Sequence, residues 1–205
     1  MAWRTLLASL LVLLAGTGSL ALATDGFRAY TTEGARRLAV ERKPPQLPDA
    51  QLQAAGGEET SFASLRGRWL LVDFIYTRCM SYCAVQGQGF ARLQRELAPQ
   101  LAAGSVELLS LSFDPRRDGP AELAAYQRRL GGVAGKGWLV ARPADAAALA
   151  AVMQAFGVVA LDDGFGGFVH NAAINVVDPS GRLVAVLDPD ALDEARDFVL
   201  GRLAP

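Results

Sequence analysis

The segment from Trp69 to Cys83 reads WLLVDFIYTRCMSYC and joins an apolar run to both cysteines of the chain. The run from Leu70 to Tyr76 is interrupted only by Asp73, which is the pattern of a strand buried on both faces. If a helix begins near Cys79, both sulfurs lie on one helix face, and the positive helix N-terminus favours their thiolate forms. The segment therefore predicts two reactive sulfurs at the carboxyl end of a central strand, where open α/β folds place their sites.

The composition of the 205-residue chain indicates one globular domain behind a secretion signal. A hydrophobic content of 51% suffices for one sizeable core, and a net charge of −1 argues against a nucleic-acid partner. Arg4, the leucine-rich stretch 6–14 and Ala21-Leu22-Ala23 form the pattern of a signal peptide with an A-x-A cleavage site. We therefore expect residues 1–23 to be a signal peptide, with an uncleaved anchor as the alternative, and the rest to be periplasmic or otherwise extracytoplasmic.

The remaining chain alternates strands and helices. Residues 24–45 are polar, end in two prolines and are expected to form an N-terminal arm, with a short helix or strand near 35–40. The folded domain is expected at 46–205. Its predicted elements are a β-hairpin within 46–65, strands at 70–76, 106–113 and 138–140, helices at 81–97, 120–130 and 144–156, a hairpin of strands at 172–177 and 183–187, and a closing helix at 189–203.

This order predicts an α/β, thioredoxin-like fold, with a central mixed β-sheet flanked by helices and an N-terminal β-hairpin. Gly87 and Gly89 reduce helix propensity within the helix at 81–97, which indicates irregular first turns or close packing there. The sequence DDGFGG at 162–167 predicts a flexible loop that leads to His170, the one histidine of the chain.

The two cysteines and His170 form a set of side chains suited to copper, because soft thiolates hold Cu(I) and imidazole adds affinity for Cu(II). Each also has a plainer explanation. Cys79 and Cys83 could form a structural disulfide, although a bridge over so short a loop restricts the unfolded chain little. His170 could be a packing or surface histidine. Zinc stays open only if carboxylates complete its ligand set.

Three aspartates are of interest beside this set. Asp73 lies inside the buried strand and needs a partner, and the sequence leaves open whether it tunes the site or bonds to backbone. Asp114 and Asp118, in SFDPRRDGP, are predicted to be turn and N-cap residues instead of catalytic ones. The sequence contains neither a nucleophile elbow nor a phosphate-binding loop.

The order of these motifs resembles the SCO/SenC family of copper proteins. The shared features are SFASLRGRWLLVDFIYTRC-x-x-x-C, LLSLSFDPRRDGP and FVHNAAINVVDPSGRLVAVL, which are spread across most of the mature chain. The resemblance implies a thioredoxin-like fold and copper held by Cys79, Cys83 and His170. It also implies a client protein, since family members deliver copper to, or reduce the cysteines of, the binuclear copper site of cytochrome c oxidase, and some serve mainly in thiol redox or copper homeostasis.

The chain departs from the family pattern around its predicted ligands. Met80 and Ala84 stand where the family usually has a proline after each cysteine, and Val169 and Asn171 flank the histidine in place of Asp and Ser or Thr. A missing proline removes backbone restraint, and a missing aspartate removes a group that could orient the imidazole. These changes bear on metal affinity, redox potential and the identity of the client.

Two functions are compatible with these residues. The first is a metallochaperone that passes copper to a client such as a cytochrome c oxidase subunit. The second is a thiol–disulfide oxidoreductase in which Cys79 and Cys83 are the redox pair. A peroxidase-like enzyme, with Arg78 beside one activated cysteine, is a weaker third. A membrane is expected to be involved only through the client or an uncleaved anchor.

Overall fold

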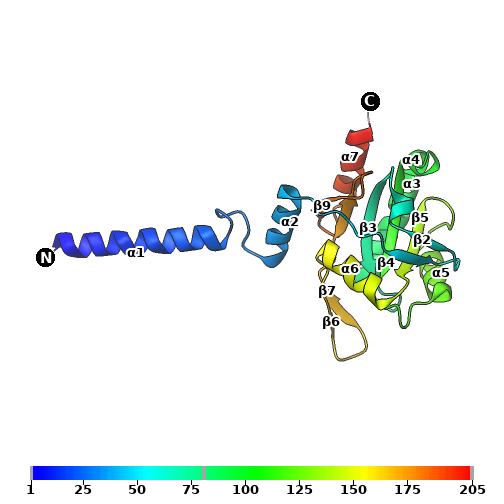
Figure 1. The fold of residues 1–205 in the computed structure, drawn as a ribbon, viewed down its shortest axis with the longest axis horizontal. Helices are drawn as coiled ribbons and strands as arrows, with labels where there is room; N and C mark the ends of the chain where they lie inside the picture. Colours follow the sequence, from blue (N-terminus) through cyan, green and yellow to red (C-terminus); the bar gives the residue numbers. More distant parts are fainter. Residues whose placement is uncertain (1, 80–81, 204–205) are drawn as a thin grey trace. The chain divides into compact units, whose positions relative to one another are not determined.

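The computed structural model describes residues 2–79 and 82–203, and the side chains of residues 82–84 lie outside this description. The chain divides into two units at the junction of Lys43 and Pro44. The first unit contains the helices α1 (Ala2–Ala23) and α2 (Thr32–Arg42), and the second contains the β-sheet (Figure 1).

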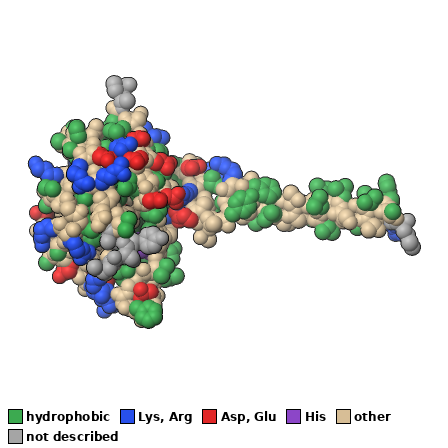
Figure 2. All heavy atoms as spheres, turned by 180° about the vertical axis from the view of Figure 1, so that it is seen from behind, with side chains coloured by type: hydrophobic (Ala, Val, Ile, Leu, Met, Phe, Trp, Pro, Cys, Tyr) green, Lys and Arg blue, Asp and Glu red, His purple; other side chains and the backbone are tan. Residues whose placement is uncertain are grey.

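Helix α1 corresponds to the predicted signal peptide. It has 22 residues, and hydrophobic side chains are distributed along it (Figure 2). Among the described residues it is the one helix that is long and apolar enough to cross a membrane, with a hydropathy of 2.1. An N-terminal secretion signal has the same length and composition, so the helix is compatible with both a cleaved signal and an anchor.

The arm predicted at 24–45 contains α2. This helix begins after Thr31, whose hydroxyl oxygen accepts a hydrogen bond from the backbone N–H of Gly34 at 3.0 Å. Threonine is a preferred N-cap because it satisfies an N–H group that the first helical turn leaves without a partner. The short element expected near 35–40 is therefore a helix.

The second unit is built on a mixed sheet. Within the described residues this sheet has seven strands in the order β2-β1-β5-β4-β3-β8-β9. The strands are β1 (Gln51–Ala54), β2 (Glu59–Ser61), β3 (Trp69–Ile75), β4 (Val106–Ser112), β5 (Trp138–Pro143), β8 (Ile174–Val177) and β9 (Leu183–Leu187). Strand β3 runs parallel to β4 and antiparallel to β8. The buried strand predicted at 70–76 thus lies inside the sheet, as its apolar run indicated.

Helices pack on both faces of the sheet. The helices of this unit are α3 (Tyr82–Glu96), α4 (Ala98–Ala102), α5 (Pro120–Arg129), α6 (Ala146–Phe156) and α7 (Leu192–Leu203). On one face, Leu71 of β3 belongs to a core cluster with Phe90 of α3 and Tyr126 of α5. On the other face, Phe74 contacts Phe156 of α6 with ring centroids 5.1 Å apart, and α6 crosses in front of the central strands in Figure 1. Leu71 and Phe74 point to opposite faces, which explains why β3 has no polar face.

Two short strands outside this sheet, β6 (Ala160–Asp162) and β7 (Phe168–His170), form a separate antiparallel hairpin that projects from the sheet in Figure 1. The sequence predicts a loop at 162–167, and the structure has the turn of this hairpin there. Carboxylate oxygens organise the turn: Asp162 accepts from the N–H of Gly164 at 2.7 Å, and Asp163 accepts from the N–H groups of Phe165 and Gly167 at 2.8 and 2.9 Å. The strands that flank the turn are too short to show a clear alternating pattern in the sequence.

Candidate metal and thiol site

The first cysteine of the predicted site lies just beyond the carboxyl end of β3. Tyr76, Thr77 and Arg78 form a tight turn after the strand, and the N–H of Cys79 donates to the carbonyl of Tyr76 at 3.1 Å. Cys79 is buried, with 5% of its surface exposed. The central strand therefore delivers this sulfur to the sheet edge where the sequence placed it.

The second cysteine lies on α3. This helix begins at Tyr82, so Cys83 belongs to its first turn, whereas Cys79 precedes the helix. The expectation that both cysteines share one helix face is therefore wrong for Cys79, because the turn after β3 comes between the strand and the helix. The first-turn position of Cys83 remains one at which the helix dipole favours a thiolate. The side chain of Cys83 lies outside the described part of the structure.

His170 ends strand β7 and packs on the aromatic end of β4. Its ring contacts Phe113 with centroids 5.0 Å apart and an interplanar angle of 58°. Burial lowers the pKa of His170 from its ordinary value of 6.5, since the charged imidazolium is less well solvated there. At neutral pH the imidazole is therefore neutral, which is the form that binds metals.

Aromatic rings hold the His170 hairpin against the ends of β3 and β4. The ring of Phe168 contacts those of Tyr76 and Phe113 edge-on, with both centroid distances at 5.3 Å. Tyr76 and Phe113 also contact each other at 5.6 Å. Edge-to-face pairs of this kind are favourable beyond their buried area. The cluster therefore brings the segment before His170 next to the residue that starts the Cys79 turn.

Two hydrogen bonds reinforce this attachment. The N–H of Phe168 donates to the hydroxyl of Tyr76 at 3.5 Å, and the guanidinium of Arg78 donates to the carbonyl of Gly166 at 2.8 Å. Arg78 also forms an ion pair with Asp114 at 3.6 Å. Arg78 thus links the Cys79 turn to the hairpin turn, which is a structural role different from the peroxidase-like one considered for it.

The predicted three-residue ligand set is not assembled within the described side chains. Among those side chains no group of three or more His, Cys, Asp or Glu residues could hold a metal ion. One member of the set, Cys83, has its side chain outside the description. The assignment of Cys79, Cys83 and His170 as copper ligands therefore stays a prediction, supported by the common location of the Cys79 turn and the His170 hairpin.

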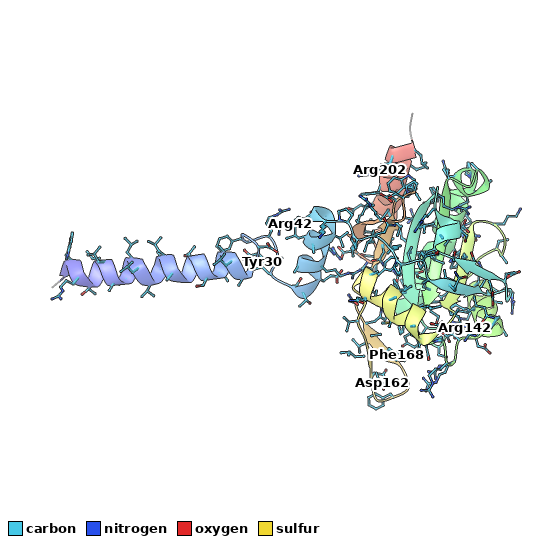
Figure 3. The ribbon with its side chains drawn as sticks, viewed as in Figure 1. Tyr30, Arg42, Arg142, Asp162, Phe168 and Arg202 are labelled. Carbon is cyan, nitrogen blue, oxygen red and sulfur yellow. The ribbon has the colours of Figure 1, made fainter. Side chains whose placement is uncertain are left out.

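A cleft of about 780 Å³ lies beside the aromatic cluster. Its walls come from the segment after β4, the start of α6 and the hairpin, and they include Phe113, Arg117, Arg142, Asp162 and Phe168. Figure 3 labels Arg142, Asp162 and Phe168, the last two of which face each other across the hairpin register. The cleft therefore borders the aromatic cluster through Phe113 and Phe168, and Cys79 and His170 are not among the residues of its walls.

Asp73, the polar residue in the predicted buried strand, is fully buried in β3. Burial raises its pKa from 3.8 to about 7, because the charged carboxylate is poorly solvated inside the sheet. Ser110 faces Asp73 in the β3–β4 register, and its hydroxyl oxygen accepts from the indole N–H of Trp138 at 3.0 Å. Ser110 is therefore the polar side chain nearest in register to Asp73, but neither carboxylate oxygen of Asp73 has a hydrogen-bond partner among the described residues, which fits a carboxyl group with a raised pKa.

Asp118 has a role that sequence reasoning missed. It was predicted to be an N-cap, but the N-cap of α5 is Gly119. Its buried carboxylate instead accepts hydrogen bonds from Thr77 and Ser112. Spacing in the sequence alone cannot distinguish the two roles, because both place an acidic residue just before a helix.

A twisted mixed sheet with helices on both faces and a cysteine pair following its central strand defines a thioredoxin-like protein. Residues 43–199 match the SCO1/SenC family, which covers more than half of the chain. This chain belongs to the SCO1/SenC family. The family resemblance inferred from the motifs is confirmed.

Known relatives agree with this assignment. The SCO1 protein homologue of Bacillus subtilis (strain 168) is 32% identical over 74 residues, which are 36% of this chain and 37% of that protein. The chain thus matches little more than a third of that relative's length.

Solved structures have the same fold. ScoI of Bradyrhizobium japonicum with copper bound is 25% identical and has a TM-score of 0.65, over 77% of this chain and 99% of that one. BsSco, described as a member of the Sco family of cytochrome c oxidase assembly proteins with a disulfide switch, is 20% identical and has a TM-score of 0.67, over 79% and 96%. These matches confirm the predicted thioredoxin-like fold.

Proposed function

We propose that this chain is an extracytoplasmic copper metallochaperone that supports assembly of a copper site in cytochrome c oxidase or a related client. The observation that carries the proposal is the attachment of the His170 hairpin to the Cys79 turn, through the Tyr76–Phe168 contact and the Arg78–Gly166 hydrogen bond. The family adds support, since the related ScoI has been solved with copper bound.

The chemistry of the donor set fits copper as a transferable cargo. Cys79 and Cys83 would supply soft sulfur ligands and His170 a nitrogen ligand, a combination that accepts both Cu(I) and Cu(II). The lowered pKa of His170 reduces competition from protons at neutral pH. Because His170 belongs to a short separate hairpin, its ligation can change without rearranging the central sheet, which suits release of copper to a partner.

The apolar helix α1 supports an extracytoplasmic location. Its position at the N-terminus and its A-x-A end at Ala21 to Ala23 fit a secretion signal, with the mature chain beginning at Thr24. In that compartment the cysteine pair would need a reductant before it could bind copper, because oxidising conditions favour the disulfide.

A copper titration of the purified, reduced protein tests the proposal. We expect about one copper ion per chain and, with Cu(II), a thiolate-to-copper charge-transfer band. Cys79→Ala and His170→Ala should each weaken copper affinity sharply, the second while leaving both sulfurs in place. Unchanged affinity in both variants would contradict the metallochaperone function.

A second candidate is a thiol–disulfide oxidoreductase that reduces client cysteines. The position of Cys83 in the first turn of α3 favours it, because this position stabilises the attacking thiolate. Thiolate attack on a client disulfide would form a mixed disulfide, and the second cysteine would displace it. The client would gain two electrons and two protons as Cys79 and Cys83 become a disulfide.

The His170→Ala variant separates the two candidates. Reduction of a model disulfide by the cysteine pair should be largely retained in this variant, whereas copper binding should be impaired. Either cysteine variant should lose both activities. A cysteine pair that forms no disulfide at any accessible potential would exclude the oxidoreductase.

A further inference from the structure

The turn that carries Cys79 is held by a fully buried carboxylate from another segment. Asp118 is 0% exposed. One of its oxygens accepts from the backbone N–H of Thr77 at 2.9 Å and from the hydroxyl of Ser112 at 2.6 Å, and the other accepts from the hydroxyl of Thr77 at 2.6 Å. Thr77 lies two residues before Cys79, and Asp118 is 41 residues from Thr77 in the chain.

The remaining polar group of Thr77 is bound as well. Its carbonyl oxygen accepts from the guanidinium of Arg129, the last residue of α5, at 2.8 Å. The backbone N–H, the hydroxyl and the carbonyl of Thr77 are therefore all bound by Asp118, which lies just before α5, and by Arg129, which ends it. Such a residue cannot rotate without breaking buried hydrogen bonds, and leaving a buried polar group unpaired is costly.

Asp118 is itself fixed at the end of β4. Its N–H donates to the carbonyl of Asp114 at 2.9 Å, and the N–H of Asp114 donates to the hydroxyl of Ser112 at 3.1 Å. Ser112 thus receives one hydrogen bond and gives one to Asp118. The network connects the ends of β3 and β4 and includes Thr77 of the Cys79 turn.

A buried carboxylate is expensive, and a turn or a helix cap can be made with an exposed one. The arrangement is explained if the rigidity of the Cys79 turn matters. We propose that Asp118 is a positioning residue that acts through Thr77 to hold the Cys79 thiol in place for its ligand or redox partner. This inference rests on the proposed function, because positioning is useful only if the Cys79 sulfur reacts or binds metal.

The variants Asp118→Ala, Thr77→Val and Thr77→Ser test this role. Asp118→Ala removes three hydrogen bonds, Thr77→Val removes one, and Thr77→Ser keeps it. The matched control is Gln94→Ala, since Gln94 is also buried and forms three hydrogen bonds, to Val133 and Lys136 away from the cysteines. Thermal unfolding is recorded for every variant.

Two readouts are used on the full chain. The first is copper affinity of the reduced protein, which should fall about tenfold to a hundredfold in Asp118→Ala and less in Thr77→Val, and return to the wild-type value in Thr77→Ser. The second is the alkylation rate of Cys79 by iodoacetamide in a Cys83→Ala background, where Cys79 is the one remaining cysteine. Release of the turn should raise that rate several-fold. Gln94→Ala should change neither readout, even if it unfolds at a lower temperature.

The two readouts separate failure of the inference from failure of the proposed function. A wild-type protein that binds no copper contradicts the metallochaperone, and the alkylation rates still decide whether Asp118 positions Cys79. Wild-type copper affinity and alkylation in both Asp118→Ala and Thr77→Val overturn the inference alone. Equal changes in Gln94→Ala overturn it too, because they would show a general loss of stability. If Asp118→Ala does not fold, the Thr77→Val and Thr77→Ser pair decides.

Discussion

Tyr76 and Phe168 meet edge-to-face with ring centroids 5.3 Å apart, although 92 residues separate them in the chain. Tyr76 directly follows the central strand, and Phe168 begins the strand that ends in His170. This contact therefore joins the part of the chain that carries the cysteines to the part that carries the histidine.

We predict that Phe168→Ala weakens copper binding although Phe168 is not itself a ligand. Removing its ring takes away the contacts with Tyr76 and Phe113, so the hairpin loses part of its attachment and more of the ordering of His170 must be supplied on binding. We expect copper affinity to fall about tenfold, measured by competition with a chromophoric chelator.

Two further variants test the reason for that loss. In a His170→Ala background, Phe168→Ala should have little additional effect, because the hairpin would then carry no ligand. Phe165 is 97% exposed at the tip of the same hairpin, so Phe165→Ala should leave affinity within about twofold of wild type. Equal losses in Phe165→Ala and Phe168→Ala would contradict the attachment.

Two helical glycines should respond oppositely to alanine. A Cβ at Gly87 of α3 would overlap the side chain of Leu130 and lie 2.6 Å from the hydroxyl of Tyr126, whereas a Cβ at Gly201 of α7 would meet nothing within 4 Å. Gly87→Ala should lower the free energy of unfolding by about 1–3 kcal/mol through overpacking. Gly201→Ala should raise it by about 0.5–1 kcal/mol through helix propensity. Urea denaturation of both variants checks the signs, and a stabilising Gly87→Ala would contradict the close packing of α3 on α5.

Much of the fold could be predicted because its elements have strong local patterns. The apolar run before Cys79 favoured a strand buried on both faces, and the structure has β3 there. The second strand of the closing hairpin, predicted at 183–187, has the same bounds as β9, whereas the first, predicted at 172–177, is β8 at Ile174–Val177. Gly157 ends α6 in the left-handed conformation, with φ at 65°, as the helix stop in the sequence indicated. The sequence left two explanations for Gly87, irregular first turns of the helix or close packing. The structure supports close packing, because a Cβ there would overlap Leu130.

The site was harder to predict because it depends on contacts between distant segments. The hairpin of β6 and β7 is held by Phe168 against Tyr76 and Phe113, and such ring contacts leave no local periodicity. The bonds from Asp118 to Thr77 depend on where two strands end beside each other, which the sequence spacing of Asp118 does not encode. The sequence therefore identified candidate ligands but not the residues that position them.

Cleavage of the N-terminal helix can be tested directly. If residues 1–23 are a signal peptide, the intact mass of the protein exported by its native host should correspond to a chain that begins at Thr24. Ala23→Arg should block this processing, because the cleavage site requires a small residue, and the protein should then stay with the membrane through α1. Leu22→Val changes a neighbouring residue without that requirement and should be processed normally. A full-length mass in the wild type would instead support the anchor.

Asp73 should contribute a pH dependence of its own to stability between about pH 4 and pH 7. Because burial raises its pKa from 3.8 to about 7, the folded state binds more protons than the unfolded state between about pH 4 and pH 7. The contribution of Asp73 to the free energy of unfolding should therefore fall as pH rises through this range, by up to about 4 kcal/mol if the whole shift is expressed. Asp73→Asn should remove that slope and be the more stable form at pH 8, as measured by urea denaturation across pH.

Asp163 is the matched control. Backbone N–H groups of Phe165 and Gly167 lower its pKa, so its contribution to stability is lost only under more acidic conditions. Asp163→Asn should keep the wild-type slope between pH 4 and 7, and the same slope in Asp73→Asn would show that another group is responsible.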